Sequence, residues 1–272
     1  TLFRSADEAA FSYAKPGDAM PSEIKLKGSV KMDGPMGTIR ARSVSMDLRA
    51  RRFEFDGEVR GETSTGEKIH AEGLTYGPDG IRLRDGVRID SKEGVVVADS
   101  ARRDERTGAL LLQGNVSIDA GDSSIRAGRV EKDENTGRIQ ASGGVEAQTA
   151  EGVMRAGSAQ VDEQGGVRIF EGGVTGSFGE IKDFTASRIV QQAKTGEVEI
   201  IDLVVPRMDL SGGTAEQDQG AQSSPFSFSS IAVDKAPKVR LLMNKVRSID
   251  GGVNLRLLSG SGPDASTRVQ AD

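Results

Sequence analysis

A valine recurs along this chain at an almost constant interval, which strongly limits the folds open to it. Successive members are separated by 29, 28, 29, 29 and 29 residues, and a glycine stands one or two places before each of them. The series consists of Val30, Val59, Val87, Val116, Val145 and Val174. A period in this range is typical of repeat proteins, in which each unit packs on its sequence neighbours.

Within each unit the apolar residues alternate with polar ones. Val116 and Ile118 belong to one alternating segment, and Ile125 and Ala127 belong to the next. A period of two is typical of a half-buried strand. Glycines in the intervening turns supply positive φ at little steric cost. Each unit should therefore hold about two antiparallel strands, and the mid-strand glycines, such as Gly143 and Gly144, should let a strand bend from one sheet to another.

The predicted fold class is all-β. We expect an elongated antiparallel β-jellyroll, a folded meander of two facing sheets, built from about six 29-residue repeats. One strand face should be apolar and the other charged. The predicted interior residues are medium-sized aliphatic side chains and one methionine: Val87, Ile89, Leu110, Leu112, Val116, Ile118, Ile125, Ile139, Met154, Val161, Val167, Ile169 and Val174.

The regular pattern does not extend over the whole chain. Residues 6–13 could form a short helix within an N-terminal lead-in, and the segment from Ser211 to Pro225 has the low-complexity composition of a linker. The predicted divisions are a lead-in at 1–22, a repeat domain at 23–206, a flexible linker at 207–225, C-terminal strands at 226–258 and a disordered tail at 259–272.

Composition argues against several classes of function. The chain has no cysteine, so disulfides and thiolate metal sites are excluded, and a net charge of −5 does not suit a dedicated nucleic-acid binder. The single histidine, His70, cannot build a metal site and is expected at the surface. Neither a nucleophile elbow nor a phosphate-binding loop is present. We therefore expect no enzymatic activity, no metal and no cofactor.

Pairs of carboxylates recur at the turns of successive repeats, as at Asp104-Glu105, Asp133-Glu134 and Asp162-Glu163. Paired acids serve glycoside hydrolases, but solvation of a turn explains this placement without catalysis.

The segment GNVSIDAGDSSIRAGRVEKDENTGRIQASGGVEAQ, residues 114–148, resembles the OstA-like family of lipopolysaccharide-transport proteins, the LptA–LptC family. The shared pattern is a glycine–small–valine opening, an apolar–x–alanine centre and an acidic turn, and it covers about Lys25 to Pro206. The resemblance implies a β-jellyroll in the periplasm, whose hydrophobic groove holds acyl chains. It also implies head-to-tail stacking with related domains into a bridge between two membranes.

The function expected is therefore that of a periplasmic lipid-binding bridge protein. It would shield the acyl chains of lipopolysaccharide or a related lipid and pass them toward the outer membrane, and a tether through an N-terminal anchor remains open. The alternative is a structural or adhesive β-solenoid with a dry core and no ligand.

Two further expectations concern contacts. Basic side chains near strand ends could meet lipid phosphates: Arg126, Arg129, Arg155 and Lys182. Other jellyroll transport proteins are expected to add edge to edge at Ile24 to Lys31, at Val198 to Val205, or at both.

Overall fold

The computed structural model describes residues 2–34, 37–150, 152–178, 181–209, 230–242, 245–258 and 266–271. These residues form strands and turns, and no helix occurs among them. The predicted all-β class and antiparallel pairing are confirmed. The chain divides into two compact units, Thr1–Gly143 and Gly144–Asp272, which are described separately.

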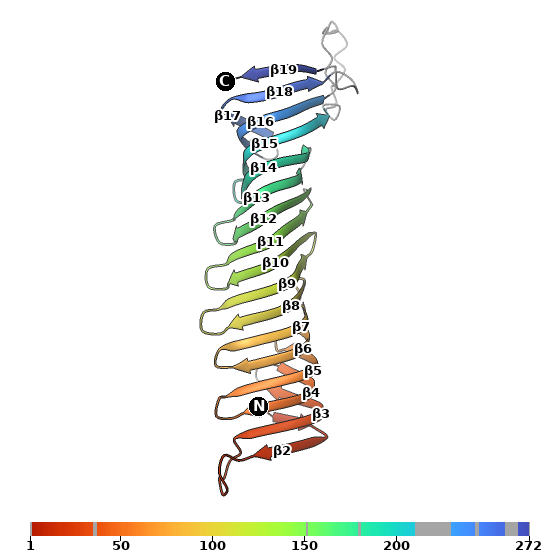
Figure 1. Ribbon diagram of the computed structural model, residues 1–272, viewed down its shortest axis with the longest axis vertical. Coiled ribbons are helices and arrows are strands. Elements are labelled where there is room, and N and C mark those ends of the chain that lie inside the picture. Colours follow the sequence, from red (N-terminus) through yellow and green to blue (C-terminus); the bar gives the residue numbers. More distant parts are fainter. Residues whose placement is uncertain are drawn as a thin grey trace. The chain divides into compact units, whose positions relative to one another are not determined.

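Unit 1 is a series of strands in which chain neighbours pair antiparallel from β3 to β10 (Figure 1). Its strands are β1 (Leu2–Ser5), β2 (Glu8–Ser12), β3 (Glu23–Gly34), β4 (Gly37–Asp47), β5 (Arg52–Thr63), β6 (Lys68–Gly77), β7 (Gly80–Asp90), β8 (Val95–Asp104), β9 (Ala109–Ala120), β10 (Ser123–Asp133) and the start of β11 (Arg138–Thr149).

Unit 2 continues the same kind of pairing and then changes it. Strand β16 pairs with β15 along one edge and with both β17 and β18 along the other, and β19 pairs with β18. The strands here are the end of β11, β12 (Gly152–Asp162), β13 (Val167–Phe178), β14 (Ile181–Gln192), β15 (Glu197–Asp209), β16 (Ser230–Leu242), β17 (Lys245–Asp250), β18 (Val253–Leu258) and β19 (Ser266–Ala271).

Odd-numbered strands from β3 to β13 each carry two consecutive left-handed residues near the middle. In β9 these are Gly114 and Asn115, with φ of 73° and 46°, and in β13 they are Gly172 and Gly173, with φ of 84° and 77°. The pairing register shifts at the same place, as between Ala127 and Arg129 of the neighbouring β10. A bulge at this position inserts an extra residue and bends the strand.

Aspartates at the turns have a structural role. Asp104 Oδ1 accepts a hydrogen bond from the backbone N of Thr107 at 3.0 Å, and Asp133 Oδ1 accepts one from Asn135 N at 2.9 Å. The backbone N–H of Thr107 lowers the pKa of Asp104. The hydroxyl of Thr136, followed by the backbone N–H of Asn135, lowers the pKa of Asp133. Because their acceptor atoms are used within the turn, these carboxylates stabilise the chain reversal itself.

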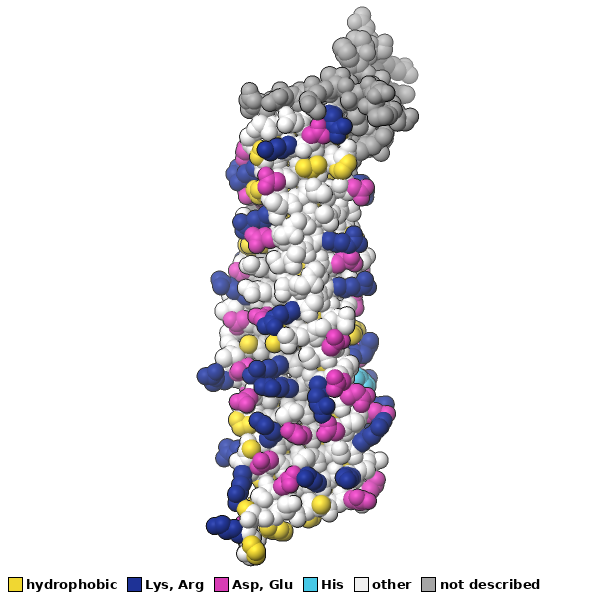
Figure 2. Space-filling view, viewed as in Figure 1, with side chains coloured by type: hydrophobic (Ala, Val, Ile, Leu, Met, Phe, Trp, Pro, Cys, Tyr) yellow, Lys and Arg dark blue, Asp and Glu magenta, His cyan; other side chains and the backbone are white. Residues whose placement is uncertain are grey.

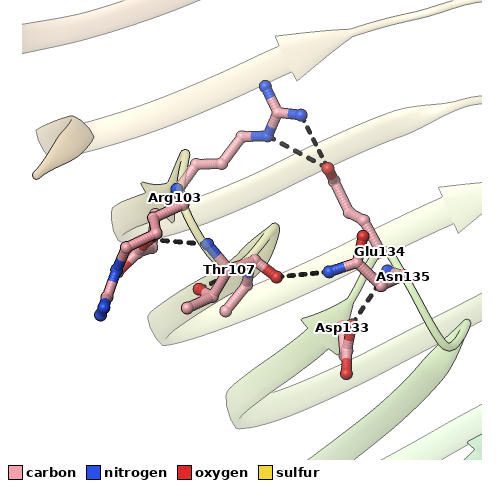
Figure 3. A network of polar contacts seen from close by, with 8 residues as sticks. Arg103, Thr107, Asp133, Glu134 and Asn135 are labelled. Carbon is pink, nitrogen blue, oxygen red and sulfur yellow. Dashed lines mark hydrogen bonds and ion pairs between the residues drawn. The ribbon is translucent and has the colours of Figure 1, made fainter.

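Successive turns in unit 1 also contact one another (Figure 3). Asn135 Nδ2 donates to the carbonyl oxygen of Thr107 at 2.7 Å, and Glu134 N donates to the carbonyl oxygen of Gly108 at 3.1 Å. Arg103 Nη2 lies 2.7 Å from Glu134 Oε2. The turn at Asp133 is therefore tied to the equivalent turn two strands earlier.

Acidification should destabilise the protein below about pH 4, the usual pKa of an aspartate in an unfolded chain. Because the folded-state pKa of Asp133 is lowered, its carboxylate stays ionised at pH values where the unfolded chain already binds protons. Its contribution to stability is complete above the unfolded-state pKa and is lost as the pH falls through the folded-state pKa. Thermal unfolding midpoints measured from pH 7 to pH 2.5 should show this decline.

The variant Asp133→Asn keeps an acceptor oxygen for the turn but cannot titrate, so its unfolding midpoint should depend less steeply on pH in the acid range. Asp122→Asn, at another exposed turn carboxylate, is the matched control and should leave the wild-type slope unchanged. Equal slopes for Asp133→Asn and the wild type would contradict this account.

Three expectations about the ends of the chain are wrong. Residues 6–13 contain strand β2 in place of a helix, because the backbone of Glu8–Ser12 pairs with Glu23–Lys27 of β3. Strand β15 continues to Asp209, past the predicted start of the linker, and β19 lies within the predicted disordered tail. Residues 210–225 of the predicted linker lie outside the described residues.

The predicted partner edges are also wrong, because the chain itself occupies them. Ile24 to Lys31 belongs to β3, which pairs with β1 and β2 on one side and with β4 on the other. Val198 to Val205 belongs to β15, which lies between β14 and β16.

Candidate functional site

The strands of each unit have one face that carries the buried apolar side chains, here called the buried face. The opposite face is polar, and Figure 2 shows basic and acidic side chains interspersed over the surface in view. On the buried face, side chains at paired positions of successive strands form rows across the strands. We call the two rows that flank the bulge the central rows, and the two rows nearer the strand ends the end rows.

The central rows of unit 1 are closed to solvent. Their members are all buried, and Val87 is 0% exposed. The row on one side of the bulge contains Leu26, Val44, Phe55, Leu74, Leu83, Ala101, Leu112 and Val130. The row on the other side contains Val30, Ala41, Val59, Ala71, Val87, Ala98, Val116 and Ala127.

The end rows of unit 1 are different, because most of their side chains are large, apolar and only half-buried. One row contains Ile24, Met46, Phe53, Tyr76, Ile81, Arg103, Leu110 and Lys132, of which Met46 is buried and Arg103 exposed. The other contains Met32, Ile39, Gly61, Ile69, Ile89, Val96, Ile118 and Ile125. Unit 1 therefore keeps two lines of apolar surface in partial contact with solvent.

In unit 2 the corresponding end-row positions are largely closed. Met154 and Phe184 are 2% and 1% exposed, and Val205 and Leu241 are each 1% exposed. Phe170 and Ile189 fill the adjoining central row. The two units thus differ in how far solvent reaches the same face of the strands.

The predicted interior residues fall into three groups. Five are buried: Val87, Leu112, Val116, Met154 and Val174. Six lie on the buried face but are half-buried: Ile89, Leu110, Ile118, Ile125, Ile139 and Val161. Val167 and Ile169 form the third group and were assigned to the wrong face.

The error in β13 follows from its pairing register. Phe170, which is buried, pairs with Ala159 and Ile189, both of them buried. Since side chains alternate along a strand, the neighbouring Ile169 points to the opposite face, where it pairs with the exposed Gln160.

Three of the four basic residues expected near a ligand lie on the polar face. Arg126 and Arg155 alternate with buried-face residues and are exposed on the other face, where Arg155 Nε lies 2.8 Å from Glu146 Oε2. Arg129 pairs with Glu131, and Lys182 is exposed.

Two other cations occupy the buried face of unit 1. Arg103 and Lys132 both pair with Leu110 in one end row. The hydrogen bond to Glu134 raises the pKa of Arg103, so its charge is held at this position. Unit 2 has a comparable residue, Arg168, which pairs with Val161 and Gln191.

A hollow of about 200 Å³ lies on the polar face of unit 1, and it is lined by Arg52, Glu54, Thr75, Gly77, Asp79, Gly80 and Arg82. Glu54 alternates with Phe53 and Phe55 of the buried face, so the hollow opens on the opposite side of the strands. Its charged lining does not suit an acyl chain.

Comparison with known proteins identifies no family for this chain. No protein-family model matches it, and neither does any curated protein. Within the described ranges, no helix is long and apolar enough to cross a membrane, and no group of three or more potential metal ligands gathers. His70 is exposed on β6, opposite Arg60 and Arg88. The proposal of a function is therefore based on the geometry of the buried and polar faces of the strands.

Proposed function

We propose that unit 1 binds the acyl chains of a lipid along the end rows of its buried face. The observation that carries this proposal is the contrast between these rows and the central rows. Central-row side chains are buried, whereas Ile89, Leu110, Ile118 and Ile125 keep part of their surface in solvent. Contiguous exposed apolar surface on a folded protein commonly marks a binding site.

The proposed architecture is the folded meander of two facing sheets, a β-jellyroll. The buried face needs a cover, and the described residues include no helix that could supply one. Bending at the left-handed pairs would bring the two halves of each strand together, with the central rows at the closed side and the end rows along the opening. An acyl chain lying along the opening would contact both end rows.

The energetics of such binding are favourable. Burial of a methylene group contributes roughly 0.8 kcal/mol, so a dozen of them would contribute about 10 kcal/mol before ordering costs. The rows are continuous across successive strands and have no single deep pocket. A chain could therefore slide along them, as carriage of a lipid requires.

The end row that contains Leu110 also holds cationic side chains that could bind an anionic headgroup. Arg103 and Lys132 flank Leu110, so a phosphate could bind there while the acyl chain lies on the neighbouring aliphatic side chains. This arrangement supports a phosphorylated lipid, of which lipopolysaccharide is the candidate named by the sequence resemblance. The resemblance alone supports a periplasmic location and a bridging role toward the outer membrane.

Other jellyroll transport proteins would join by edge-to-edge strand pairing, as proposed from the resemblance. Strand β19 pairs with β18 along one edge, and no described residue pairs with its other edge. We place the partner strand there.

Unit 2 supports the alternative, a dry structural core, over its own length. Its end-row side chains Met154, Phe184 and Leu241 are almost fully buried, so the end rows of unit 2 offer less apolar surface to a ligand than those of unit 1. The lipid-binding proposal is therefore restricted to unit 1.

Photo-crosslinking tests the proposal. A benzophenone side chain placed at Ile125 or Ile139 should form a lipid adduct in cells, and mass spectrometry of the purified protein should identify the lipid. Ile169 is the matched control, because it is an equally half-buried isoleucine on the polar face. Equal adduct yields at all three positions, or none at any, would contradict lipid binding on the buried face.

A further inference from the structure

Strand β2 has one paired edge and one free edge. Glu8–Ser12 pairs antiparallel with Glu23–Lys27 of β3, and no described residue pairs with the other side of β2 (Figure 1). The strand is also exposed on both faces, since every residue from 5 to 20 is exposed. An unpaired strand edge presents a row of backbone donors and acceptors to another chain.

Three large apolar side chains on β2 and in the segment that follows it are exposed. Phe11 is 55% exposed, Tyr13 is 53% exposed and Met20 is 73% exposed, which makes them the most exposed of the large apolar residues described. Ile249 of β17 is the next, at 41%. Apolar side chains at this exposure cost free energy in water, and a covering partner would relieve that cost.

The edge has few of the features that usually prevent strand addition, and Glu8 is the one charged residue within β2. Residues 5–14 include no lysine, arginine or proline, and the first such residues are Lys15 and Pro16, beyond the end of β2. By contrast β17, whose one paired edge is with β16, has exposed charges at Arg247 and Asp250. Charged residues and prolines are the common protection of edge strands.

The sequence of β2 is complementary to itself in the antiparallel direction. With Ala10 opposite Ala10 of a second copy, Glu8 faces Ser12 and Ala9 faces Phe11. No like charges are opposed, and each large Phe11 ring meets a small alanine on the same face. A contact of this kind is isologous, so it closes at two copies.

We propose that β2 is the contact surface between two copies of this chain, paired antiparallel about a twofold axis at Ala10. This inference does not depend on lipid binding. It assigns a different edge from the one proposed for transport partners.

The absence of cysteine allows a direct test. Directly opposed residues of antiparallel strands have Cα atoms about 4.5–5.5 Å apart, which is within the range of about 4.4–6.8 Å that a disulfide requires. Ala10→Cys should therefore give nearly complete disulfide-linked dimer under mild oxidation. Gln113→Cys, at an exposed position within β9, is the matched control and should remain monomeric on a non-reducing gel.

Analytical ultracentrifugation supplies the second measurement. The wild-type chain should show a concentration-dependent equilibrium between monomer and dimer, and Phe11→Lys should shift it toward monomer by at least tenfold. Phe11 is exposed, so circular dichroism should show the variant folded. Wild type that is monomeric at all concentrations would overturn the proposal. Open-ended oligomers without the Ala10→Cys crosslink would also overturn it, in favour of pairing between β2 and a different edge.

Discussion

Leu112→Ala should lower the free energy of unfolding by about 2–5 kcal/mol, the usual cost of truncating a buried leucine. Leu112 is 2% exposed and lies in a central row, between Ala101 and Val130 on the neighbouring strands. The cavity left by the truncation would be enclosed by those neighbours, so water could not fill it favourably. Urea unfolding followed by circular dichroism measures the loss.

Leu110 provides the matched control, since it is the same residue type on the same face of the same strand. It is half-buried in an end row, so Leu110→Ala should lower the free energy of unfolding by only about 1 kcal/mol. If the end rows bind acyl chains, this variant should instead retain several-fold less lipid after purification. Equal destabilisation by the two variants would mean that the end rows are as closed as the central rows.

Gly172→Ala, at a bulge, should lower the free energy of unfolding by about 2–4 kcal/mol. Gly172 has φ of 84°, a conformation that alanine adopts only with strain. A Cβ there would also lie 3.2 Å from the Cα of Gly157 on the adjacent strand, and backbone atoms cannot easily move away. Backbone strain and steric crowding therefore both lower the free energy of unfolding, and their effects add.

Gly173 separates these two effects. Its φ of 77° is nearly the same, but a Cβ would have no atom within 4 Å. Gly173→Ala should lose only the backbone term, about 1–2 kcal/mol. Thermal or urea unfolding of the two variants measures the difference. A loss at Gly173 as large as that at Gly172 would show that the close approach to Gly157 carries no cost.

The fold class could be predicted because local signals agreed with one another. Alternation predicted strands, and the paired mid-strand glycines marked positions of unusual backbone, which the structure shows to be left-handed at Gly143 and Gly144. The sequence could also have shown which side chains of β13 lie on the buried face. Leu83, Leu112 and Phe170 each precede the recurring valine by four residues, so counting back from Val174 gives Phe170 instead of Ile169.

The face on which some side chains lie, and the existence of strand β2, could not be predicted from the alternation, because the pairing between strands determines both. In even-numbered strands a register irregularity reverses the alternation, for example between Ala98 and Ala101. This places Arg103 on the buried face, where continued alternation from Ala98 would have placed Arg102. Strand β2 likewise has little alternation of its own and depends on hydrogen bonds from β3.

Pairing between chain neighbours has a consequence for how the molecule folds. Because nearly every strand from β3 to β10 contacts the strands immediately before and after it, most contacts close short loops, and the entropy of closing them is small. Low contact order favours rapid folding from a local nucleus that then extends hairpin by hairpin. In the monomer, amide hydrogen exchange should consequently be slowest in the middle of unit 1 and become progressively faster toward β2, which is paired with β3 along one edge.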